Sequence, residues 1–161
     1  MSKWTLVSVA VLAAVASVLL ATAGAASRAA GSTYVIKATL DTKHEVPAAK
    51  DAEGAKGVLT GKLTVNGKKS SFVWQLSFSG LTGRATASHL HYAAAGKAGP
   101  IALPLCVPCA GSPAHGEYKG PFVATAAFLK AILHGGMYAN VHTKVNPSGE
   151  IRGQVEATAS K

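Results

Sequence analysis

Two histidines spaced i and i+2, His89 and His91, are the residues whose spacing most directly suggests chemistry. In a β-strand such residues project to one face, about 6–7 Å apart, so both imidazoles can coordinate one transition-metal ion. A third imidazole, His142, ends an apolar run, and the three rings converge if the two strands are neighbours. Three nitrogen ligands from strands suit copper or zinc. The alternative is that His89 and His91 face solvent or hydrogen-bond a loop carbonyl.

Neutral imidazole is the ligand form, so a fall in pH through about 6.5 is expected to release such a metal. The remaining histidines point less clearly to a site. His44 and His115 lie in predicted loops, where either is a fourth ligand or an exposed side chain, and we expect exposure. His134 falls at the end of a predicted helix, where a positive side chain suits the helix dipole.

The spacing Cys106-x-x-Cys109 is compatible with several states of the two cysteines. We expect a disulfide, because oxidation is favoured outside the cytoplasm. A metal pair joined by a histidine such as His115, a redox-active dithiol and two free thiols are the alternatives. The βαβ pattern that usually accompanies a redox dithiol is missing. Pro104 and Pro108 favour a loop around this pair.

Other catalytic chemistry has little support in the composition. The chain has 161 residues but only 7 Asp+Glu, and Asp51 and Glu53 read as loop residues. No nucleophile elbow, P-loop or H-E-x-x-H motif occurs. The formal charge of +9 is spread along the chain without an aromatic-interleaved basic stripe, so no nucleic-acid partner is expected.

The elements that must position these residues are strands. Alternation and turn residues predict strands at 33–40, 57–65, 71–78, 85–93, 100–105, 117–124, 137–143 and 150–157. Asn66-Gly67 predicts a hairpin. One face of the third strand carries Phe72, Trp74, Leu76 and Phe78, which should enter the core. Residues 125–134 predict one short amphipathic helix. The expected fold is an all-β, antiparallel, Greek-key-like β-sandwich with one short helix.

The N-terminal segment is built like an export signal. Lys3 precedes an apolar run, and small residues up to Ala23 or Ala25 fit a cleavage site. We therefore expect a signal peptide at 1–25, a linker at 26–32 and one domain at 33–157, in a secreted or periplasmic protein. The alternative is an uncleaved segment that anchors the protein in a membrane, which is the one membrane contact the sequence suggests.

Four segments, taken in order, resemble the CHRD domain, named for chordin and found in many exported bacterial proteins. They are residues 38–47 with His44-Glu-Val-Pro47, residues 78–82, residues 87–101 with His89-Leu-His91, and residues 138–154 with His142 and Arg152. The resemblance covers residues 33–157. In chordin the domain belongs to a secreted antagonist of growth-factor signalling, but the resemblance implies no specific activity for a stand-alone bacterial type. The Cys106–Cys109 loop departs from the simplest family pattern.

A looser likeness concerns the site. Copper-zinc superoxide dismutases are β-sandwiches with a His-x-His strand and a later Val-His strand at copper, and His89, His91 and His142 are similar to those positions. Arg152 resembles the residue that guides the anionic substrate there, or it lies behind the metal ligands. No acidic zinc cluster or bridging histidine is identified, and a shared fold does not fix function.

Two functions of different class follow. The first is a non-catalytic, extracytoplasmic binding module with a copper or zinc site. The second is a structural or protein-interaction domain without metal, whose partner is an unidentified protein or envelope component. We expect no enzyme activity, because the dismutase likeness is an analogy of fold and motif.

Overall fold

The computed structural model describes residues 31–66, 69–112, 114–118 and 123–160, and of residues 114–118 only the backbone. The expected signal peptide and most of the expected linker lie outside this range. Helices long and apolar enough to cross a bilayer do not occur within it.

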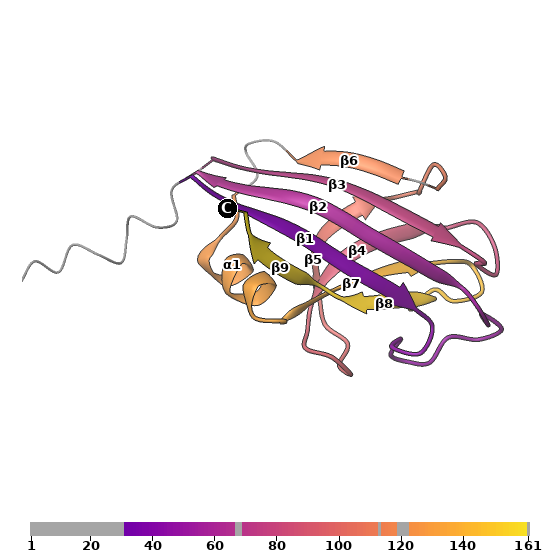
Figure 1. The fold of residues 1–161 in the computed structure, drawn as a ribbon. Coiled ribbons are helices and arrows are strands. Elements are labelled where there is room, and N and C mark those ends of the chain that lie inside the picture. The colour runs from indigo at the N-terminus through magenta and orange to yellow at the C-terminus, as the bar shows by residue number, and fades with distance from the viewer. Residues whose placement is uncertain (1–30, 67–68, 113, 119–122, 161) are drawn as a thin grey trace, which may run out of the picture.

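The described chain forms nine strands and one helix (Figure 1). The strands are β1 (Ser32–Asp41), β2 (Lys56–Asn66), β3 (Lys69–Ser79), β4 (Ala87–Tyr92), β5 (Ile101–Cys106), β6 (Ala114–Tyr118), β7 (Met137–His142), β8 (Ile151–Gln154) and β9 (Glu156–Ala159). The helix α1 (Ala126–Leu133) precedes β7 and lies beside β9.

All strands belong to one antiparallel sheet, and this corrects the predicted sandwich. The hydrogen-bonded order is β5-β4-β7-β8-β1-β2-β3-β6, with β9 also paired to β1. Asp41 of β1 pairs with Arg152 of β8, and this pair joins the two halves that a sandwich would keep as separate sheets. The end strands β5 and β6 contact each other, so the sheet is curled into a half-barrel.

Alternation along the strands accounts for the core, as predicted. Phe72, Trp74 and Leu76 of β3 are buried, Phe78 is half-buried, and Val73 between them is 45% exposed. Burying one apolar row on a curled sheet removes those side chains from water without a second sheet. The β2–β3 pairing runs to Asn66 and Lys69, and the tip of the predicted hairpin, residues 67–68, lies outside the described residues.

Several element boundaries differ from those predicted. The strand expected at 150–157 is two strands, because the backbone amide of Val155 pairs with Met137 while β9 moves over to β1. The strand expected at 117–124 starts earlier, at Ala114, and part of its expected range is not described. The helix forms as expected, with the Thr125 side chain accepting a hydrogen bond from the amide of Phe128.

Replacing Trp74 by alanine is expected to lower the free energy of unfolding by about 3–5 kcal/mol, because its 4% exposed ring fills the core. Val73→Ala, one residue along on the exposed face, should cost less than about 0.5 kcal/mol. Urea unfolding of both variants measures the difference. Equal effects would show that the ring of Trp74 does not pack as described.

Candidate metal centre

The register between β4 and β7 assembles the histidine cluster. Ala87 pairs with His142 and His89 pairs with Asn140, so the side chains of His89, His91 and His142 project from the same face of the sheet. Val141, next to His142, is fully buried on the opposite face. His142 therefore lies on the polar face of the sheet, while Val141 enters the core.

The three rings lie close together. Ring centroids are 5.0 Å apart for His89 and His142, 5.4 Å for His89 and His91, and 6.1 Å for His91 and His142. One ring nitrogen from each residue can be chosen so that all three lie within 4.8 Å of one another. The structure therefore brings together the three imidazoles that the sequence predicted as a set.

Two backbone carbonyls set the tautomers of two rings. Nδ1 of His91 donates to the carbonyl oxygen of Gly99 at 2.9 Å, and Nδ1 of His142 donates to that of Pro147 at 3.0 Å. A neutral imidazole that donates through Nδ1 carries its lone pair on Nε2. Both rings therefore offer Nε2 as a ligand atom. Metal-binding histidines commonly have this kind of outer partner.

Burial keeps the cluster neutral. Burial, together with charge repulsion from His142 and His91, lowers the pKa of His89 to about 4. Burial also lowers the pKa of His91 and His142, against the hydrogen bonds to Gly99 and Pro147. Neutral imidazole is the form that binds a metal ion, so the cluster could hold one at neutral pH.

The spacing of the nitrogens fits one ion after a small adjustment. Nδ1 of His89 and Nε2 of His142 are 3.0 Å apart. Two nitrogens bound to one ion in tetrahedral geometry, with bonds of about 2.0–2.1 Å, lie about 3.4 Å apart. The widest separation of 4.8 Å therefore has to shorten by about 1.4 Å, which the two rings can share. Without a metal, the 3.0 Å contact is a hydrogen bond between the two rings.

An aromatic ring and a guanidinium lie behind His91. The rings of His91 and Tyr138 are stacked, with centroids 4.8 Å apart and planes 6° apart. Cζ of Arg152 lies 3.4 Å from the centre of the Tyr138 ring, and its Nη2 donates to the carbonyl of Ala94. Arg152 is only 1% exposed. This stack restricts the tilt of the His91 ring, whereas a role for Arg152 in guiding anions stays a prediction.

A buried carboxyl reaches the same layer from the loop after β1. Glu45 is buried, and Asn140 hydrogen-bonds its side chain. Burial raises the pKa of Glu45 to about 7, although Asn140 and the charge of Arg152 act against this rise. Gly149 makes the room, since a Cβ there would lie 1.5 Å from Oε1 of Glu45. Gly149 also has φ +136°, which favours glycine.

Polar atoms without partners gather around the cluster. Of five such buried side-chain atoms in the described chain, four are Oε2 of Glu45, Nε2 of His91, Oδ1 of Asn140 and Nη1 of Arg152. Buried polar groups normally have a partner, and a bound water or ion is one explanation for the exceptions. For Nε2 of His91, a metal ion shared with the other two rings would supply the missing partner.

A second buried carboxylate secures the loop between β7 and β8. Glu150 is fully buried and accepts hydrogen bonds from the hydroxyls of Thr82 and Thr143, the amide of Thr82 and Nδ2 of Asn146. Burial would raise the pKa of Glu150, but these hydrogen bonds outweigh it and hold the pKa below its usual value. This network holds the segment whose Pro147 carbonyl orients His142.

The other predicted residues lie apart from the cluster. His44 pairs with Asp41 at 2.7 Å with a side chain 65% exposed, and His134 is the exposed C-cap of α1. For His115 only the backbone, opposite Gln75, is described. Cys106 and Cys109 form a disulfide, which confirms the expected bridge and leaves neither as a metal ligand.

Sequence reasoning missed three residues that shape the cluster: Tyr138, Asn140 and Glu45. Tyr138 and Asn140 precede His142 by four and two residues, so alternation alone places them on its face. Glu45 belongs to the His44-Glu-Val-Pro47 motif, which by itself assigns the carboxyl no role. No local signal indicates that a loop carboxyl enters the sheet's polar layer.

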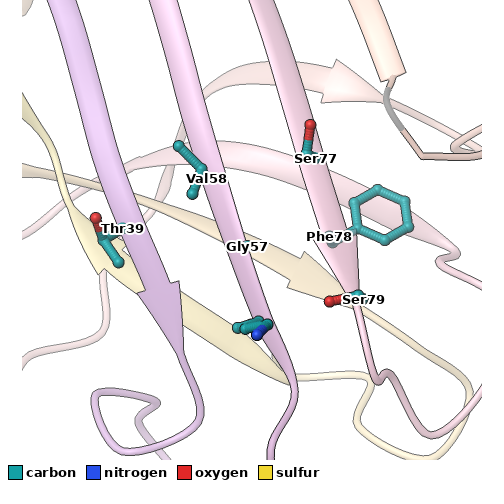
Figure 2. A pocket seen from close by; sticks show the side chains of 7 residues that line it. Thr39, Gly57, Val58, Ser77, Phe78 and Ser79 are labelled. Atoms are coloured by element: carbon teal, nitrogen blue, oxygen red, sulfur yellow. The ribbon is translucent and has the colours of Figure 1, made fainter.

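A hollow on the β1–β3 part of the sheet is separate from this centre. Figure 2 shows it between Thr39, Val58 and Phe78, and it has a volume of about 320 Å³. Its lining contains Lys56 but no histidine, cysteine or acidic side chain. It therefore offers no set of metal ligands.

The sheet and the cluster define a small all-β domain with a three-histidine centre. The sequence model of the CHRD domain matches residues 36–155, from the middle of β1 to the end of β8. The chain belongs to the CHRD domain family, as its motifs suggested. No curated protein and no solved structure matches it.

The buried groups predict an unusual pH dependence of stability in metal-free protein. Below pH 6.5 the unfolded chain binds a proton at His89 that the folded chain does not, so this residue destabilises the fold as pH falls. Glu45, whose pKa is raised from 4.5 to about 7, binds its proton first in the folded state and stabilises the fold over the same range.

Glu45→Gln removes the carboxyl whose protonation stabilises the fold as the pH falls, and it leaves the destabilising effect of His89 unopposed. The variant should lose at least about 2 kcal/mol of unfolding free energy between pH 6.5 and 4.5, because His91 and His142 add to the effect of His89, whereas the wild type should lose clearly less. Urea unfolding with a chelator present at several pH values tests this. Parallel pH profiles for the two proteins would show that Glu45 does not titrate as its burial implies.

Proposed function

We propose that this CHRD domain is a non-catalytic binding module that holds one copper or zinc ion on His89, His91 and His142. The supporting observation is a cluster of three neutral imidazoles whose ring nitrogens lie within 4.8 Å. Two of these rings are oriented by backbone carbonyls, and Nε2 of His91 is buried without a partner.

The donor set favours these two metals. Imidazole nitrogen suits copper and zinc, and no acidic or cysteine side chain joins the three histidines in the described chain. Three protein ligands leave a coordination position open, which a water molecule or a group from a partner would fill. We propose a location outside the cytoplasm, which the export-like N-terminal sequence supports.

A second function is favoured by one contact. The 3.0 Å separation between Nδ1 of His89 and Nε2 of His142 is also an ordinary hydrogen bond. In that case the cluster is a polar network that stabilises a structural or protein-interaction domain. Its partner would be an unidentified protein or envelope component.

Metal titration separates the two functions. Calorimetry with Cu(II) and with Zn(II) should show one site per chain, and His89→Ala/His91→Ala should weaken binding at least about 100-fold, because two of three ligands are lost. His44→Ala/His134→Ala is the matched control, since both of its side chains are exposed and outside the cluster. Unchanged affinity in the first variant would favour the metal-free interaction domain.

The pH of metal release reports on the same site. The lowered pKa values of the three histidines mean that fewer protons compete for the ligand nitrogens at a given pH. Release is therefore expected below pH 6.5, the value for an unperturbed histidine. Measuring bound metal after dialysis at stepped pH tests this, and half-release at or above pH 6.5 would contradict it.

A further inference from the structure

The geometry points to a second binding site, at the end of the sheet where three loops meet, for a small organic anion: a monocarboxylate with an aliphatic tail. The loops connect β3 to β4, β5 to β6 and β7 to β8. They line an open cavity of about 600 Å³, a volume typical of small-molecule sites. This site is built without the three histidines and does not depend on a bound metal.

Hydrogen bonds to Glu150 hold two of the three loops. Thr82 lines the cavity and binds the Glu150 carboxylate through both its amide and its hydroxyl. Thr143 and Asn146, on either side of the lining residues 144–145, bind the same carboxylate. The cavity walls are therefore set before a ligand arrives, which reduces the ordering cost of binding.

The disulfide holds the third loop. Pro108 lines the cavity and lies inside the short loop closed by Cys106 and Cys109. Cys109 is buried against the core, so the bridge ties this wall to the sheet. Such a short loop gains little stability from a disulfide, and a role in shaping the cavity explains the bridge better.

The lining combines an apolar surface with two cations. Ala85, Pro108 and Val145 provide apolar surface, and Val145 is 46% exposed. Arg84 and Lys144 are exposed, and within the described chain neither has an acidic side chain within 4.0 Å. Two cations that lack an acidic partner among the described residues, beside an apolar wall, complement a carboxylate with an aliphatic body.

The nearest buried anion does not oppose this ligand. Glu150 is fully buried, and its charge is already satisfied by donors from Thr82, Thr143 and Asn146. The hollow in Figure 2 has a single cation, Lys56, in its lining, whereas the cavity between the loops has two. A carboxylate should therefore prefer the cavity between the loops.

The test uses octanoate as the probe, with octanamide as its uncharged counterpart. In ¹H–¹⁵N NMR titrations of the purified protein, octanoate should shift the amide signals of Ala85, Thr86 and Val145. Octanamide should bind at least tenfold more weakly. Arg84→Gln/Lys144→Gln should weaken octanoate binding at least tenfold. Lys62→Gln/Lys130→Gln, an equal charge change at exposed positions in β2 and α1, should change it less than twofold.

Chelator-treated protein and metal-loaded protein are titrated separately, so failure of the metal proposal leaves this test intact. Absence of saturable shifts with octanoate would overturn the inference, as would equal binding of octanamide. Shifts confined to the sheet hollow around Val58 and Ser77 would also overturn it. So would binding of an apolar tripeptide carboxylate without binding of octanoate, because the partner would then be a protein chain.

Discussion

The register between β4 and β7 is the constraint on which the site depends. Side chains alternate along a strand, so a slip of one residue would turn His89 and His91 into the core and Leu90 out of it. Leu90, Ala139 and Val141 are fully buried on the other face, and this apolar row makes such a slip costly. The same packing that stabilises the sheet therefore sets the distances between the imidazoles.

Around β7 and β8, the polar face of the sheet is buried almost as deeply as the apolar face. Arg152, Glu150 and Asn140 are each at most 1% exposed, which is costly unless charges and polar atoms have partners. Glu150 has a full set of donors, whereas Arg152 relies on the Tyr138 ring, the Ala94 carbonyl and the nearby charge of Glu45. The incomplete pairing is concentrated around the histidine cluster, and there a metal ion would supply the missing partner of Nε2 of His91.

Much of the local structure could be predicted, because it follows from short-range rules. Alternation identified the buried row of β3 and the common face of His89 and His91, and the helix from Thr125 onward followed from its pattern. The curled single sheet could not be predicted, since alternation is the same in a sandwich and in a half-barrel. One long-range pair, Asp41 with Arg152, distinguishes the two.

By itself, the sequence determined the strand faces, the likeness to the CHRD family and the choice of His89, His91 and His142 as a set, because residue type and spacing carry that information. Only the tertiary structure decided that the three rings meet, that Glu45 enters the layer beside them through the gap at Gly149, and that Arg152 lies buried behind Tyr138. Each of these depends on contacts between segments far apart in the chain. Those contacts form when the whole sheet curls and buries its surface, and no local pattern encodes them.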